Sequence, residues 1–146
     1  MLWITRSHVH VDCVACPWLI TRFVDSRAEF LFVPANQVEP IASETGAIPF
    51  DIPGVELGHE SGRCSFESIM LKYNLTNPGL RRLAKIVHSA DVDEDIDLDP
   101  LARGLEALAS GYSLRYPLDE DNLAHQFEVY DALYAWCCLD AARAEK

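Results

Sequence analysis

The chain contains 146 residues, of which 49% are hydrophobic, and carries a formal net charge of −11. This length and composition predict one globular domain, residues 1–146, and exclude a disordered, repetitive or collagen-like chain. The acidic balance argues against direct binding to nucleic acid or to anionic membranes, because both require a basic surface.

The N-terminal quarter predicts two strands on either side of a helix. Residues 3–6 form a short strand that we expect at a sheet edge, and residues 28–34 form a second, aromatic-rich strand. Between them, residues 13–24 place apolar side chains at helical spacing. Asp12 or Cys16 are the alternative N-caps of this helix.

The next segment predicts the rest of a small sheet. Residues 36–44 form a weak helix or a loop, which Gly46 closes. Short strands are then expected at residues 47–50 and 55–59, separated by a proline–glycine turn.

The second half of the chain is predicted to be helical. Gly111 is expected to end the third of four helices, and the fourth shows the cleanest apolar periodicity. The expected helices cover residues 65–73, 77–90, 101–109 and 121–142. The fold class is therefore α+β, a mostly helical single domain with a small N-terminal β-sheet.

The chain has five cysteines, and this odd number argues against a fully paired disulfide framework. The N-terminus lacks the apolar core of a signal peptide, and no apolar stretch approaches the roughly 20 residues of a membrane span, so we expect a cytoplasmic protein. Cys13 and Cys16 form a CxxC motif at a helix start, where the helix dipole would lower a thiol pKa. A thiol oxidoreductase is thus one candidate function, with two buried packing thiols as the alternative.

Histidines and acidic residues supply candidate ligands for a divalent transition metal. Glu67 follows Cys64 by three residues, a spacing that places both on one helix face, and they could equally form a capping box. Imidazole and carboxylate groups suit iron, manganese or zinc, with Cys64 as a further ligand or as an exposed catalytic reductant. We expect the main ligands to converge on one pocket: His59, Glu67, His88 and Asp91, with His10 and Asp12 nearby.

A second acidic feature is the run from residue 91 to residue 99, with Asp at every odd position. Its second half approaches the spacing of a calcium-binding loop. Pro100 stands where such a loop needs glycine, and Arg103 stands at a ligand position, so a solvated acidic loop is the favoured interpretation.

Arginine is the natural partner of a tetrahedral oxyanion, because its guanidinium group donates two parallel hydrogen bonds. The candidate oxyanion-binding residues are Arg6, Arg22 and Arg63. Arg22 interrupts an apolar helix, so the alternative is a structural ion pair with Asp12 or Asp25. Asp131, inside the last helix, is a further candidate partner for one of these groups.

Several longer motifs run through nearly the whole chain in a fixed order. They are HVDCVACPWLITRFVD at 10–25, PFD at 49–51, ELGH at 56–59, CSFE at 64–67, IVHSAD at 86–91 and YDALYAW at 130–136. With these motifs the chain resembles the chromate-resistance protein family, the C-terminal domain of ChrB-type regulators. Cys13 stands where that family usually has arginine, and the DNA-binding extension of full-length regulators has no counterpart in these residues.

The resemblance implies a cytoplasmic, single-domain stress-response protein linked to chromate resistance, with chromate or another small oxyanion as its partner. Together with the candidate ligands, it leads us to expect a metal-binding protein that acts in detoxification or sensing of chromate. Two alternatives stay open: a CxxC oxidoreductase, and a metal-free chromate-sensing module that signals through a partner.

Overall fold

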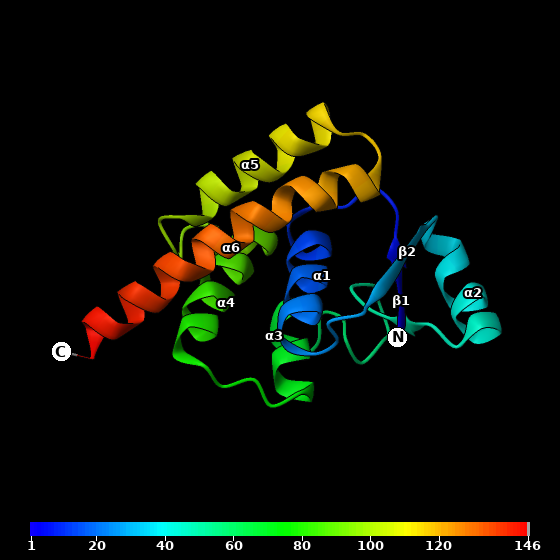
Figure 1. Cartoon of the computed structure of the whole chain (residues 1–146), viewed down its shortest axis with the longest axis horizontal. Coiled ribbons are helices and arrows are strands. Elements are labelled where there is room, and N and C mark those ends of the chain that lie inside the picture. Colours follow the sequence, from blue (N-terminus) through cyan, green and yellow to red (C-terminus); the bar gives the residue numbers. More distant parts are fainter. Residues whose placement is uncertain (146) are drawn as a thin grey trace.

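A computed structural model describes residues 1–145, which form a helical bundle beside one small sheet (Figure 1). The expected α+β class, mostly helical with a small N-terminal sheet, is confirmed. The strands are β1 (Leu2–Arg6), β2 (Glu29–Val33) and β3 (Ile48–Pro49). The α-helices are α1 (Val11–Phe23), α2 (Val38–Thr45), α3 (Ser65–Lys72), α4 (Pro78–Asp91), α5 (Ala102–Arg115) and α6 (Asp119–Ala144). Short 3₁₀ turns are η1 (Ala35–Gln37) and η2 (Asp93–Asp95).

The sheet is parallel and has the order β2-β1-β3. The first strand is therefore central, and the expectation that it lies at an edge was wrong. Trp3 aligns with Phe30 of β2 on one side and with Ile48 of β3 on the other. Trp3, Ile4 and Thr5 are all buried, as is typical of a parallel strand covered on both faces.

Two further expectations about boundaries were wrong. Residues 55–59 form turns rather than a strand. A Cβ on Gly58 would lie 2.5 Å from the carbonyl oxygen of Ile52, so this loop folds back on itself too tightly for strand pairing. Helix α5 continues through Gly111 to Arg115, because packing against α6 outweighs the roughly 1 kcal/mol that glycine costs inside a helix.

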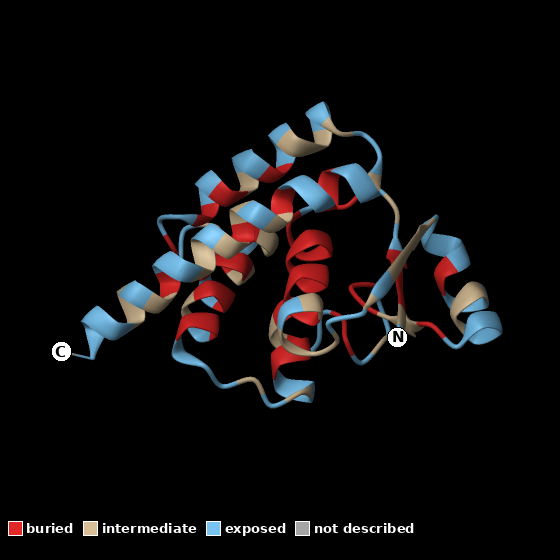
Figure 2. Cartoon of the chain, in the orientation of Figure 1, coloured by how far each residue is buried: buried red, intermediate tan, exposed pale blue. Residues whose placement is uncertain are grey.

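Helix α1 forms the centre of the bundle. Every residue from Val11 to Ile20 is buried, and Figure 2 shows this helix almost entirely in the buried colour. Helices α3, α4, α5 and α6 all pack against it. A helix enclosed on all sides needs no polar face, and this explains why its sequence is apolar all round.

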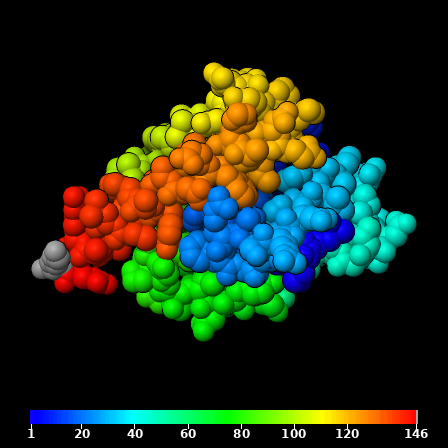
Figure 3. All heavy atoms as spheres, viewed as in Figure 1, coloured from blue at the N-terminus to red at the C-terminus, as the bar shows by residue number. Residues whose placement is uncertain are grey.

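Helix α6 covers one side of the bundle and keeps its outer face in solvent, where Figure 3 shows it in orange and red. Its Asp131 accepts hydrogen bonds from the Trp18 indole (2.8 Å) and from Arg22 (3.0 Å). Asp131 is thus confirmed as the partner of Arg22, and the expected pairing with Asp12 or Asp25 was wrong. Within the described residues, no helix is both long enough and apolar enough to cross a membrane.

A matched pair of leucines tests this core. Leu83 on α4 is 0% exposed and Leu114 on α5 is 84% exposed. We expect Leu83→Ala to lower the free energy of unfolding by about 2–5 kcal/mol, because it leaves a cavity. Leu114→Ala should change it by less than about 0.5 kcal/mol. Urea unfolding followed by circular dichroism measures both, and equal effects would contradict the packing described here.

Candidate metal centre

Asp12, in the first turn of α1, is only 1% exposed. The expectation that Asp12 or Cys16 caps this helix was wrong, because His10 occupies the N-cap. The Asp12 carboxylate instead accepts the backbone N–H groups of Ser65 (2.7 Å) and Phe66 (3.1 Å) at the start of α3. The positive end of α3 thereby offsets part of the cost of burying this charge.

His59 lies opposite Asp12, on the long loop between β3 and α3. Three carboxylate oxygens surround its Nε2 atom: Asp91 Oδ2 at 2.8 Å, Asp12 Oδ2 at 3.4 Å and Asp51 Oδ1 at 3.7 Å. Asp91 is the last residue of α4, so four different parts of the chain meet at one imidazole nitrogen. We call these four residues the His59 site.

Asp51 is the member of the His59 site that the sequence analysis did not select. It follows β3 in a left-handed backbone conformation (φ 53°), which aspartate tolerates better than most residues. Its carboxylate accepts hydrogen bonds from the Ser65 hydroxyl (2.8 Å) and the Cys13 thiol (2.5 Å), and it lies 3.6 Å from Arg6. The PFD motif at residues 49–51 was the sequence signal that could have revealed it.

The environment of the His59 site disfavours the ionised form of its three carboxyl groups. Burial raises the pKa of Asp51 to about 6, and the charge of Asp12 adds to this effect. Burial also raises the pKa values of Asp12 and Asp91. The hydrogen bond to Asp12 raises the pKa of His59 to about 9, so in the absence of a bound cation the imidazolium is the internal counterion of the site.

The His59 site opens to solvent on one side. The imidazole is 46% exposed and lines a hollow of about 390 Å³ together with Arg6, Asp51 and the turn at 52–54. The guanidinium of Arg6 stands at this opening and is about half exposed. A small ligand or ion can therefore reach the imidazole without displacing the core.

A second group, which we call the His88 cluster, comprises Cys64, Glu67, His88 and Asp95. The two ring nitrogens of His88 lie 2.5 Å from Glu67 and 2.6 Å from Asp95. Burial lowers the pKa of His88, but the hydrogen bonds to Asp95 and Glu67 outweigh it and raise the pKa overall. Because both nitrogens are engaged, His88 ties α3 and η2 to α4. Donor atoms of Cys64, Glu67 and His88 also lie within 4.8 Å of one another.

Glu67 also closes a capping box at the start of α3, where it accepts the backbone N–H of Cys64 (3.0 Å). This is the capping arrangement that the sequence left open. The structure therefore divides the expected single ligand set into two groups, one around His59 with Asp12 and Asp91, and one around His88 with Glu67.

The acidic run serves several partners rather than one ion. Asp91 faces His59, Asp95 bonds His88, and Asp99 lies 2.6 Å from Arg82. These residues are spaced by four, and each compensates a different cationic side chain. Asp99 is 1% exposed, so the expected solvated acidic loop was wrong at this residue, which Arg82 compensates inside the fold.

The remaining candidates lie outside the His59 site. His10 is exposed at the N-cap of α1. Arg22 pairs with Asp131 on the surface, and Arg63 lines a separate groove between α3 and α4. Of the three candidate arginines, only Arg6 stands beside the His59 site.

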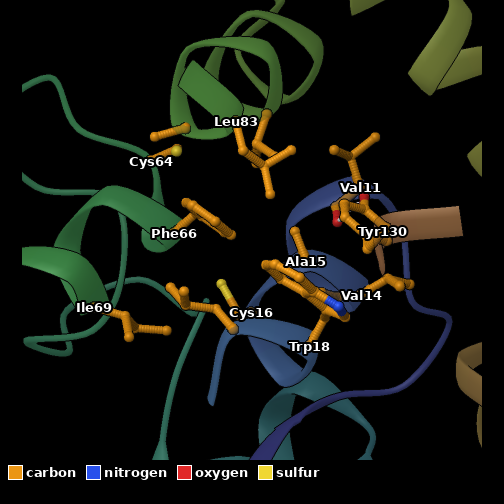
Figure 4. Close-up of a cluster of buried hydrophobic side chains, with 14 of the residues drawn as sticks. Val11, Val14, Ala15, Cys16, Trp18, Cys64, Phe66, Ile69, Leu83 and Tyr130 are labelled. Atoms are coloured by element: carbon orange, nitrogen blue, oxygen red, sulfur yellow. Dashed lines mark hydrogen bonds between the residues drawn. The ribbon is translucent and has the colours of Figure 1, made fainter. Parts of the chain in front are cut away.

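The thiols are poorly placed for redox chemistry. Cys13, Cys16 and Cys64 are buried, and Figure 4 shows the last two among apolar side chains such as Phe66 and Ile69. Burial raises the pKa of all three thiols, and neighbouring carboxylates raise it further. The expected lowering by the helix dipole and the expected exposure of Cys64 were both wrong, because the thiols face buried acids in a closed core.

Comparison with known proteins gives the chain a family context. A family model described as ChrB, C-terminal domain, matches residues 3–137. The chain is 37% identical over 133 residues to protein ChrB from Cupriavidus metallidurans, an alignment that covers 90% of this chain and 39% of that protein. The chain thus spans less than half the length of this curated relative. No solved structure matches it.

Thiol reactivity tests the burial of the cysteines. With a chromogenic disulfide reagent, we expect only the half-buried Cys138 to react quickly in the native protein, and all five thiols to react after unfolding. Cys138→Ser should abolish the fast phase. A fast phase that persists in this variant would place a reactive thiol at one of the other four positions.

The pKa of His59 predicts how stability depends on pH in metal-free protein. A raised imidazole pKa contributes stability that is fully present below about 6.5 and is lost as pH rises through about 9. We expect a loss of about 1–2 kcal/mol over this range, since solvent screens the half-exposed ring. The readout is the difference in urea-unfolding free energy between the wild type and His59→Gln, which should shrink towards pH 9.5. A constant difference would contradict the charge balance described here.

Proposed function

Since the chain belongs to the ChrB C-terminal domain family, we propose that it acts in chromate resistance through a divalent metal centre at the His59 site. In this proposal Asp12, His59 and Asp91 are the metal ligands, and Asp51 lies beside them. The centre either senses chromate or takes part in its detoxification. The observation that carries the proposal is the convergence of three carboxylates on one imidazole nitrogen.

The spacing of the donor atoms supports a metal at this place. Ligands at about 2.1 Å from an ion lie roughly 3.0–3.4 Å from one another in octahedral or tetrahedral geometry. Nε2 of His59 lies 2.8 Å from Asp91 and 3.4 Å from Asp12, and one donor atom from each of the three residues lies within 4.8 Å of the others. Small side-chain adjustments would bring all three to one ion.

The surroundings of the carboxylates also fit a metal centre. Metal-binding carboxylates are commonly held by hydrogen bonds from the protein. Asp12 has its two backbone donors from α3, and Asp51 has the Ser65 hydroxyl and the Cys13 thiol. Both carboxylates are therefore oriented before any ion binds, which lowers the cost of assembling the centre.

The donor set favours Fe(II), Mn(II) or Zn(II), because carboxylate and imidazole ligands suit these ions and Cu(I) prefers sulfur. A bound ion of this kind would supply Lewis-acid chemistry and, for iron or manganese, a redox-active centre. For His59 to be a ligand, its Nε2 must lose the proton that otherwise compensates the carboxylates. Metal and proton therefore compete for the same nitrogen.

Arg6 is the residue that we propose binds the oxyanion. Its guanidinium lies at the opening of the His59 site, 3.6 Å from Asp51, and faces solvent. In a chain of net charge −11, an anion needs such a local cation to approach. Chromate held there would lie next to the metal centre.

Metal binding by matched variants tests this proposal. After removal of bound ions with a chelator, affinity for Mn(II), Fe(II) and Zn(II) is measured by equilibrium dialysis and elemental analysis. We expect one ion per chain, and at least about tenfold weaker binding in His59→Gln and Asp91→Asn. His88→Gln is the control and should bind as the wild type does. Loss of binding in His88→Gln alone would move the metal to the His88 cluster.

The role of chromate is tested on the same proteins. Binding of chromate by calorimetry should depend on the metal and should weaken by about tenfold in Arg6→Gln. Loss of chromate absorbance with turnover assigns detoxification, whereas metal-dependent binding without turnover assigns sensing. Chromate binding that is equally strong without metal would favour the metal-free sensing module.

A further inference from the structure

A groove lies between the outer faces of α3 and α4, away from the His59 site. It has a volume of about 460 Å³, within the range of small-molecule sites. On α4 its lining residues recur at helical spacing, so they share one face, which borders the buried stripe of that helix at Ala84. We call this cavity the α3–α4 groove; its lining includes Arg63, Met70, Leu75, Arg81, Ala84 and Lys85.

The cationic side chains of the α3–α4 groove lack acidic partners. Among the described residues, no carboxylate lies within ion-pair distance of Arg63, Arg81 or Lys85, and no side-chain hydrogen bond engages them. Elsewhere the acidic surface is used to pair cations, as in Arg82 with Asp140 (2.8 Å) and Lys72 with Glu56 (3.1 Å). In a chain of net charge −11, three unpaired cations around one cavity form a local positive site.

Arg63 carries a second and independent signal. Its Nε atom is buried and has no hydrogen-bond acceptor, one of two such side-chain atoms in the described residues. An unsatisfied buried donor is costly, and in native proteins it commonly marks a missing ligand or water. The missing acceptor at Arg63 therefore points to an anion or a polar group in this groove.

The remainder of the groove is apolar. Met70 and Ala84 are buried at its floor, and Leu75 is half-buried at its side. A fully hydrated inorganic ion would gain nothing from this surface, whereas an alkyl or aryl group would be removed from water by it. The two halves of the groove thus favour a ligand with an anionic head and an apolar body.

We propose that the α3–α4 groove binds a small amphipathic anion, whose carboxylate or phosphate head contacts Arg63, Arg81 and Lys85 and whose apolar body lies on Met70, Leu75 and Ala84. This site is separate from the His59 site and does not depend on a metal there. His88 and Glu67 stand at one end of the groove, where they are already bonded to each other. A ligand in the groove would therefore cover the His88 cluster.

Amide chemical shifts of the full chain test the site with four probes: octanoate, octyl phosphate, octanol and inorganic phosphate. We expect octanoate or octyl phosphate to shift resonances of α3 and α4, and the stronger of the two identifies the head group. Octanol and inorganic phosphate should each bind at least about tenfold more weakly, because each lacks one half of the ligand.

Paired variants distinguish binding that depends on the cations of the groove from non-specific binding. Arg81→Gln with Lys85→Gln should weaken binding of the better probe by at least about tenfold, and Arg63→Met should weaken it as well. Arg27→Gln with Arg103→Gln removes two exposed cations outside the groove and should leave binding unchanged. Octanol binding as strongly as the anions, phosphate alone binding as strongly, shifts confined to residues outside 63–88, or concentration-dependent shifts without ligand would each overturn the proposal.

Discussion

The buried carboxylate of Asp12 organises this molecule. It sits in the buried first turn of the central helix, and it is tolerated there because the N-terminus of α3 points two backbone amides at it. These two hydrogen bonds hold α3 against α1. The oxygen that accepts the Ser65 N–H, Oδ2, also faces Nε2 of His59. The core packing and the geometry of the His59 site therefore depend on the same contact.

Two histidines perform related structural tasks near the first turn of α3 and the last turn of α4. His59 gathers carboxylates from α1, α4 and the loop after β3, while His88 bridges acidic groups on α3 and η2. The two histidines differ in how their ring nitrogens are used. Both ring nitrogens of His88 are hydrogen-bonded, so this side chain connects α3, α4 and η2. Nε2 of His59 faces three oxygens beside an open hollow, and this surplus of negative charge is why we propose the cation at the His59 site.

Much of the site's chemistry could be predicted from residue types. The motifs at 10–25, 56–59 and 86–91 contain Asp12, His59 and Asp91. The sequence predicted that these three residues lie close together, and in the structure they do. Asp51 was missed because a lone aspartate in a loop resembles many solvated ones, and Asp95 because it stands in an acidic run that was expected to face solvent. The thiols were misjudged for a similar reason, since CxxC at a helix start looks alike whether the helix end is open or enclosed by buried acids.

The sequence alone determined the fold class and the position of most helices, because these depend on local periodicity and on contacts a few residues apart. Tertiary structure alone decided that β1 lies in the middle of the sheet, that the His and acidic residues separate into two groups, and that Arg22 belongs to Asp131. These features pair residues that are 20 to more than 100 positions apart. Their pairing depends on how helices cross in three dimensions, and spacing along the chain carries no record of that crossing.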